Sequence, residues 1–184
     1  SKVVSQNRYG FYSGACGIAF TYVRIGTLLQ RERLIERGLE LLKSLNGLSL
    51  DVRNIDVIAG SAGLIPVVLS IARAYQSEEL IQLAIRHGEY LLKQAIQDDR
   101  GVSWKTFVNA THENLTGYAH GVAGIISALM ELHAVTGDRR FQQTALDGLR
   151  YESYWYSERK KNWVDLRSQK NQDRSQNDSE FSCG

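Results

Sequence analysis

A glycine pair with the spacing G-x-x-G occurs three times in this chain, and each pair is followed by the same kinds of residue. The pairs are Gly14/Gly17, Gly60/Gly63 and Gly121/Gly124. After the second glycine, an aliphatic residue follows at once, two charged residues stand 15 and 16 positions on, and an apolar residue stands 17 positions on. Agreement at these offsets in three copies, without a gap, indicates an internal repeat.

Each copy has the pattern of a helical hairpin. Residues 18–29 and 64–75 are apolar on most sides, which is typical of a helix that is buried all round. Residues 80–95 instead place apolar side chains on one helical face and charged ones between them, which predicts an amphipathic helix. No segment shows convincing strand alternation. We therefore predict an all-α fold of repeated hairpins near residues 14–47, 60–97 and 121–156, followed by a polar tail over residues 157–184. Such hairpins stack into a solenoid or close into a ring.

Composition narrows the function classes. The 184 residues suffice for one domain, and a net charge of +2 is too small to favour nucleic acid as a partner. No apolar run reaches the roughly 18 residues that a membrane span needs, so we expect none. Two cysteines, Cys16 and Cys183, do not make a disulfide framework, which favours a reducing, cytoplasmic location. Met130 is the only methionine, so the chain lacks a start residue. We therefore expect it to be a fragment of a longer protein.

The residues before the glycine pairs are the candidate functional residues. If the three first helices run in the same direction, these residues meet at one rim: Tyr12 and Ser13, then Asp56, then His120. Cys183 is followed by Gly184 and is placed to begin a fourth unit. An aspartate, a histidine that titrates near neutral pH and a cysteine are typical of acid–base and metal chemistry. Helix N-termini also favour developing negative charge.

Two segments together carry a resemblance to a known family. Residues 54–63 (NIDVIAGSAG) followed by residues 115–125 (LTGYAHGVAGI) resemble the lanthionine synthetase C-like cyclases. Residues 12–18 are similar to the first repeat of that family. Residues 101–104 (GVSW) and 162–167 (NWVDLR) are similar to the C-terminal cyclase domain of class II lanthipeptide synthetases. The resemblance spans nearly the whole chain.

The resemblance implies a fold, a reaction and partners. It implies an α/α toroid with a central zinc, in which zinc-bound thiolates of a precursor peptide add to dehydroalanine or dehydrobutyrine and form thioether rings. Asp56 matches the catalytic aspartate of the family and His120 its catalytic histidine. Either can take part in thiol deprotonation or in protonation of the enolate, and the resemblance does not separate these roles. A class II protein would also carry a dehydratase domain before this one.

The expected zinc site is incomplete within these 184 residues. Cys183 stands where the first cysteine ligand of the family is expected, but Ser182 replaces the tryptophan before it. The later Cys–His pair of ligands is absent from the chain. Because zinc sites use four ligands, or three and a substrate, Cys183 alone cannot hold zinc tightly. Whether this chain alone is an enzyme is therefore an open question at this point.

Plainer interpretations stand beside these. His120 can be a histidine at a helix start bonded to a carbonyl, Asp56 a loop cap, and Cys16 a small core residue. The whole chain can be a non-catalytic helical-repeat module that binds peptides, or a degenerate cyclase. A toroid enzyme that processes glycans would need paired carboxylates across a cleft, and only Asp56 is well placed for that.

Overall fold

Three helical hairpins, one for each copy of the repeat, make up most of the fold. The computed structural model describes residues 8–51, 54–106 and 113–167. Within them the helices are α1 (Ala15–Leu28), α2 (Glu32–Ser44), α3 (Ser61–Tyr75), α4 (Glu78–Gln94), α5 (Val122–Thr136) and α6 (Arg139–Tyr154), with a short 3₁₀ helix, η2, over Leu45–Gly47. The all-α prediction is confirmed. The closed ring implied by the resemblance stays a prediction.

The helices keep the register of the sequence repeat. The first helix of each hairpin begins two residues before the second glycine of its pair, at Ala15, Ser61 and Val122. The second helix begins 15 residues after that glycine, at Glu32, Glu78 and Arg139. The charged residues at this offset therefore open the amphipathic helices. In each hairpin the second helix therefore begins 17 residues after the first.

A loop that folds back explains where each first helix starts. The first N–H groups of a helix lack partners within the helix, and here none of the three N-caps is a side-chain cap. Instead, a backbone carbonyl seven residues earlier accepts the first N–H in each copy, in the bonds Ala15 N to Arg8 O (2.9 Å), Ser61 N to Asn54 O (3.1 Å) and Val122 N to Leu115 O (3.0 Å).

The second glycine of each pair lets this loop approach the helix. A Cβ atom built on Gly17, Gly63 or Gly124 would lie 2.0, 1.9 or 2.1 Å from the carbonyl oxygen six residues earlier. No side chain fits at that separation, so glycine is required by contact rather than by backbone angle. The G-x-x-G motif is therefore repeated because each hairpin has the same contact between its loop and its first helix.

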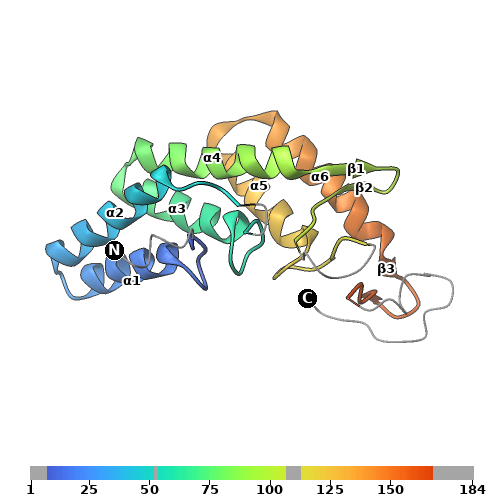
Figure 1. Cartoon of the computed structure of the whole chain (residues 1–184), viewed down its shortest axis with the longest axis horizontal. Coiled ribbons are helices and arrows are strands. Elements are labelled where there is room, and N and C mark those ends of the chain that lie inside the picture. The colour runs from blue at the N-terminus through green and yellow to red at the C-terminus, as the bar shows by residue number, and fades with distance from the viewer. Residues whose placement is uncertain (1–7, 52–53, 107–112, 168–184) are drawn as a thin grey trace.

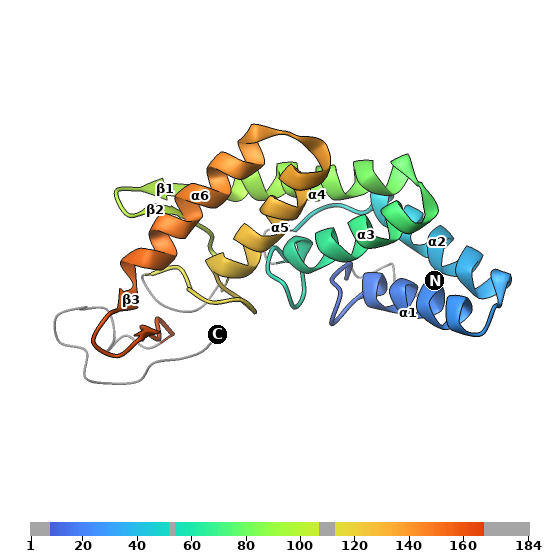
Figure 2. The same cartoon turned by 180° about the vertical axis from the view of Figure 1, so that it is seen from behind.

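The hairpins follow one another in a row, with α1–α2 at one end and α5–α6 at the other (Figure 1). The second helices α2, α4 and α6 lie above the first helices α1, α3 and α5 in both the front and the back view (Figure 2). The loops that precede α1, α3 and α5 consequently lie on one side of the molecule. No helix in the described parts has both the length and the apolar character that crossing a membrane requires.

Position in the row decides how far each first helix is buried. The middle helix, α3, packs between α1 and α5, and Leu64, Ile65 and Val68 on it are fully buried. The expectation that residues 18–29 are buried all round is wrong, because α1 ends the row and Ile18 and Leu28 keep 42% and 74% of their surface exposed. The contacts of α1 are mainly with α2, and fewer are with α3.

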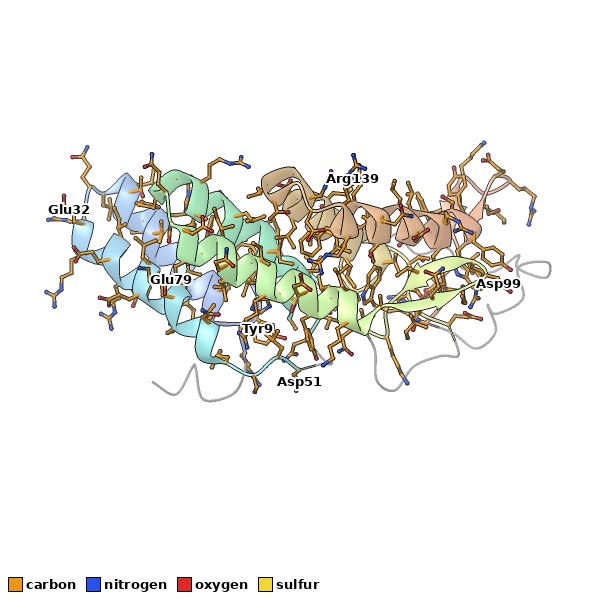
Figure 3. All side chains as sticks on the ribbon, turned by 90° about the horizontal axis from the view of Figure 1, so that it is seen from above. Tyr9, Glu32, Asp51, Glu79, Asp99 and Arg139 are labelled. Atoms are coloured by element: carbon orange, nitrogen blue, oxygen red, sulfur yellow. The ribbon has the colours of Figure 1, made fainter. Side chains whose placement is uncertain are left out.

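Two short antiparallel hairpins were not expected from the sequence. β1 (Ile96–Asp98) pairs with β2 (Gly101–Ser103), and Asp99 marks the tip of that hairpin (Figure 3). β3 (Tyr156–Ser157) pairs with β4 (Asn162–Trp163) directly after α6. Strands of two or three residues are too short to show alternation. The second hairpin falls in the region assigned to a polar tail, where Val164 and Leu166 are buried; residues 168–184 lie outside the described residues.

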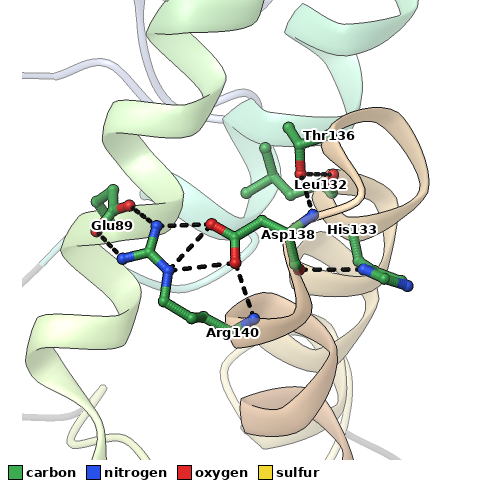
Figure 4. A network of polar contacts seen from close by, with 6 residues as sticks. All are labelled: Glu89, Leu132, His133, Thr136, Asp138 and Arg140. Carbon is green, nitrogen blue, oxygen red and sulfur yellow. Dashed lines mark hydrogen bonds and ion pairs between the residues drawn. The ribbon is translucent and has the colours of Figure 1, made fainter.

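The turn between α5 and α6 also links two hairpins (Figure 4). Asp138 caps α6 by accepting from the backbone N–H of Arg140 at 2.9 Å. The Arg140 guanidinium donates to the Asp138 carboxylate and reaches across to Glu89 on α4. These hydrogen bonds from Arg140 lower the pKa of Asp138. The outer helices of the second and third hairpins are thus joined by an ion pair as well as by packing.

Candidate functional site

The loops before α1, α3 and α5 form a continuous row. The backbone N–H of Tyr12 in the first loop donates to Ile58 O in the second at 3.3 Å. The N–H of Val57 in the second loop donates to Ala119 O in the third at 3.2 Å. Because the backbones are joined sideways, side chains from different repeats are held next to one another. We call this row of loops the rim.

Asp56 and His120 meet on the rim although 64 positions separate them in the chain. His120 Nδ1 lies 2.6 Å from Asp56 Oδ2. The other oxygen of Asp56, Oδ1, accepts the backbone N–H of Ala59 at 2.7 Å. Asp56 is therefore a loop cap and a partner of His120 at once, with one oxygen for each. Its side chain is 8% exposed, whereas that of His120 is 42% exposed.

This geometry fixes which ring nitrogen of His120 can act as a base. A carboxylate only accepts hydrogen bonds, so Nδ1 carries the hydrogen in the contact with Asp56. In the neutral ring, Nε2 then holds the lone pair. A buried carboxylate that orients an imidazole and stabilises its protonated form is the arrangement used for general acid–base catalysis. The partly exposed ring is accessible to a substrate.

A small pocket of about 50 Å³ lies beside His120. Its walls come from the loop before α5 and from the segment after β4, namely Leu115, Thr116, Ala119, His120, Val164, Asp165, Leu166 and Arg167. Asp165 binds the Arg167 guanidinium with two hydrogen bonds of 2.9 and 2.6 Å. These bonds lower the pKa of Asp165. The site therefore combines an Asp–His pair with a largely exposed guanidinium paired to Asp165 and room for a small side chain.

Neither Arg167 nor Glu152 was predicted from the sequence to be a site residue. Arg167 lies in the NWVDLR segment, which is similar to the class II cyclase domain. Glu152 on α6 is buried and accepts two backbone N–H groups from the His120 loop and the start of α5. The position of Glu152 in the sequence could have identified it. It is the charged residue among those that recur at helical spacing on the buried face of α6, which are Phe141, Ala145, Gly148, Glu152 and Trp155.

The N-terminus of α5, which is the positive end of the helix dipole, is therefore paired with a side chain of the protein itself. Helix N-termini were expected to favour negative charge that develops during a reaction, but at α5 the negative group is the carboxylate of Glu152. The other first-turn N–H groups bond to loop carbonyls. The N–H groups of Val122, Ala123 and Gly124 at the start of α5 are therefore already paired within the protein.

The remaining candidate residues have different surroundings. Tyr12 is exposed on the first loop, and Ser13 Oγ donates to Ile58 O at 3.4 Å, so both belong to the rim but not to the Asp56–His120 pair. Cys16 is fully buried on α1, as expected of a core residue, and burial raises the pKa of its thiol to about 12. A thiol in this state is neither a nucleophile nor a metal ligand.

The residues that the structure describes do not supply a zinc site. In residues 8–51, 54–106 and 113–167, no three side chains of the His, Cys, Asp and Glu types are grouped so that they could hold a metal ion. Cys183, the predicted ligand, lies outside these residues. The Asp56–His120 pair is therefore the part of the predicted site whose geometry is defined.

Comparison with known proteins agrees with the resemblance seen in the sequence. A search of curated proteins finds no match to the chain. A family model described as "Lanthionine synthetase C-like protein" matches residues 1–179, which include all three hairpins, the rim and the segment that carries Arg167. This chain therefore belongs to the lanthionine synthetase C-like family.

Proposed function

We propose that the chain is a cyclase domain in lanthipeptide biosynthesis, which adds cysteine thiolates of a precursor peptide to dehydroalanine or dehydrobutyrine. Membership of the lanthionine synthetase C-like family supports the reaction class. The observation that carries the proposal is the 2.6 Å contact between Asp56 and His120 at an accessible rim. The addition needs a base and an acid at one place, and an oriented imidazole serves as both.

The proton balance of the reaction fits one histidine. The thiol loses its proton, the sulfur bonds to the β-carbon of the dehydroamino acid, and the electron pair of the double bond moves toward the carbonyl to give an enolate. The α-carbon then takes up a proton. His120 Nε2 can accept the first proton and return it in the last step, so the reaction needs no other reactant. Asp56 holds the ring in place and stabilises its protonated form.

Arg167 supports the same reaction from the other side of the pocket. The enolate carries negative charge on the carbonyl oxygen, and a guanidinium close to that oxygen lowers the energy of this state. Asp165 holds the guanidinium with two hydrogen bonds, which reduces the reorganisation needed during the reaction. The pocket of about 50 Å³ has room for a methyl-sized group, which is what distinguishes dehydrobutyrine from dehydroalanine.

The proposal also includes a zinc cofactor, a precursor peptide as substrate and a place in a class II lanthipeptide synthetase. In this family a bound zinc would lower the pKa of the substrate thiol, and Cys183 would be one of its ligands. The described residues do not supply the other ligands, so no step here depends on the metal. A dehydratase domain in the same protein is proposed from the class II resemblance, and a cytoplasmic location from the two cysteines, which do not make a disulfide framework.

A cyclisation assay tests the function. The protein is incubated with zinc and a peptide that contains one cysteine and one dehydroalanine, and the remaining thiol is labelled with a maleimide and counted by mass spectrometry. We expect wild-type protein to consume the thiol, and His120→Asn and Asp56→Asn to slow its loss by about 100-fold, in the range of lost acid–base catalysis.

His133→Asn is the matched control, because His133 lies at the other end of α5 and outside the rim. It should leave the rate unchanged. Wild-type protein that binds the peptide but consumes no thiol at any zinc concentration would contradict the proposal. It would favour the non-catalytic peptide-binding module, for which His120→Asn should not alter peptide binding.

A further inference from the structure

Glu152 is a buried carboxylate that holds the loop carrying His120. It lies on α6, is 4% exposed, and its Oε1 accepts the backbone N–H groups of Gly117 at 3.0 Å and Ala123 at 2.7 Å. These two residues stand three positions before and three positions after His120. One oxygen atom therefore fixes both ends of the segment that presents the imidazole.

The same segment is held from the opposite side by the second loop. Val57 N donates to Ala119 O at 3.2 Å, and Asp56 accepts from His120. The direction of the His120 ring is thus set by contacts from α6 and from the loop before α3. A loop held from one side alone could keep its helix and still turn the ring away from Asp56.

Comparison among the repeats shows that packing does not require a carboxylate here. Counted from the second glycine of each pair, Glu152 is at offset 28, and the residues at this offset in the other two copies are Leu45 and Leu91. Both leucines are fully buried. An apolar side chain therefore fills this position twice, and the carboxylate is found in the repeat whose loop carries the histidine.

The hydrogen bonds of the loop differ in the same way. In the second copy, the N–H of Ala62 donates to the backbone carbonyl of Ile55 at 3.1 Å. The equivalent residue in the third copy is Ala123, and its N–H donates to Glu152 instead. The loop before α5 therefore takes a path that depends on a side chain of α6, whereas the equivalent N–H group at the start of α3 bonds to the backbone of its own loop.

Holding a carboxylate in this position has a cost. Burial raises the pKa of Glu152 to about 7, even though the hydrogen bonds from Gly117 and Ala123 act in the opposite direction. A buried leucine would avoid this desolvation. The equivalent residues in the other repeats are leucines, so core stability does not explain a carboxylate here. The loop that Glu152 holds explains it more simply.

We propose that Glu152 is a positioning residue, which shapes residues 117–123 so that His120 meets Asp56. The proposal deepens the proposed function and rests on it for the catalytic consequence. The structural consequence, a defined path of the His120 loop, does not depend on catalysis. The two can therefore be tested apart.

The test compares Glu152→Leu with Glu152→Gln. Leucine fits the position in the other repeats but accepts no hydrogen bond, whereas the glutamine oxygen can still accept both N–H groups. In Glu152→Leu, we expect the amides of Gly117 and Ala123 to exchange with deuterium at least about tenfold faster. The Nδ1–H resonance of His120 should lose the downfield shift that the bond to Asp56 gives it. Glu152→Gln should keep both signals.

The cyclisation assay supplies the catalytic arm. We expect Glu152→Leu to lower kcat by about 10- to 100-fold with KM within about threefold, because the substrate still binds but the imidazole is displaced. Glu152→Gln should restore most of the rate. Unchanged amide exchange and an unchanged His120 resonance in Glu152→Leu would overturn the proposal, as would a Gln variant as damaged as the Leu variant. If wild-type protein forms no thioether, the exchange and resonance measurements still decide the positioning role.

Discussion

Among the described histidines, His87 is the one that is fully buried. It lies on α4 with no exposed surface, and its Nδ1 is 2.9 Å from Ser61 Oγ at the start of α3. The Tyr9 ring packs edge-on against it, and its Nε2 has no hydrogen-bond partner among the described residues. Burial, and to a lesser degree the charge of Arg86, lower the pKa of His87 to about 3.

His87 should therefore lower the free energy of unfolding as the pH drops below about 6.5, the ordinary pKa of histidine, whereas Glu152, whose pKa burial raises to about 7, should raise it over the same range. Between about pH 6.5 and 3 the unfolded chain binds a proton at His87 that the folded protein does not, so the unfolded state gains stability as the pH falls. His87 alone should lower the free energy of unfolding by about 2 kcal/mol between pH 7 and pH 5. Urea denaturation at the two pH values measures the change.

The double variant Ser61→Ala/His87→Leu isolates this effect, because it removes the titrating ring and the hydroxyl that would lose its partner. Its free energy of unfolding should be lower than that of wild type at pH 7, and on going from pH 7 to pH 5 it should lose about 2 kcal/mol less than wild type does. His133→Gln should keep the wild-type dependence, since His133 is only half-buried. An equal pH dependence in the double variant and in wild type would rule out His87 as the cause.

At the scale of elements, the turn inside each hairpin shows how strictly the repeat is kept. The residues 13 positions after the second glycine are Gln30, Gln76 and Gly137, and their φ angles are 52°, 50° and 70°. All three are in the left-handed region that ends a helix. Glycine adopts this region without penalty, whereas a residue with a Cβ is strained there by about 1 kcal/mol.

Glycine should therefore stabilise two turns that now contain glutamine. We expect Gln30→Gly and Gln76→Gly each to raise the free energy of unfolding by about 0.5 kcal/mol, because the relief of strain exceeds the greater freedom of glycine in the unfolded chain. Gly137→Ala should lower it by about 1 kcal/mol. Thermal or urea denaturation provides the comparison. Gln82→Gly, inside α4, is the control and should be destabilising by about 1 kcal/mol.

The repeat explains how much of the fold could be predicted. The glycine pairs predicted the helix starts to within three residues, since helices expected from residues 18 and 64 begin at Ala15 and Ser61. The same loop-to-helix contact recurs at Gly17, Gly63 and Gly124. The repeat also placed Asp56 and His120 at one rim. The roles of Glu152 and Arg167 could not be predicted in this way. Each of these two roles depends on a contact that is found in one repeat only. A pattern shared by all copies of a repeat does not predict the contacts in which the copies differ.

At the scale of the whole molecule, the described residues of the row of hairpins leave the apolar outer side of α1 uncovered. On the outer side of α1, a groove of about 330 Å³ is lined by Ile18, Thr21, Tyr22, Ile25 and Leu34. Leu28 and Leu29 at the end of the same helix are also exposed. The equivalent surface of α3 is covered by a neighbouring hairpin, so the same type of helix surface is buried in the middle of the row and bare at its end.

This side should make the chain self-associate as its concentration rises, because contiguous apolar patches on a protein surface favour association. We expect the sedimentation coefficient to increase with concentration for the wild-type chain, and Ile18→Lys/Ile25→Lys to abolish most of that increase. Both side chains are more than two-fifths exposed, so the double variant should keep its helix content and its free energy of unfolding within about 1 kcal/mol. Leu146→Lys, a comparably exposed change on α6, should leave the association unchanged. A monomer at every concentration would show that the groove of α1 does not drive contact between copies, and equal effects of the α1 and α6 variants would show that association is not specific to the end of the row.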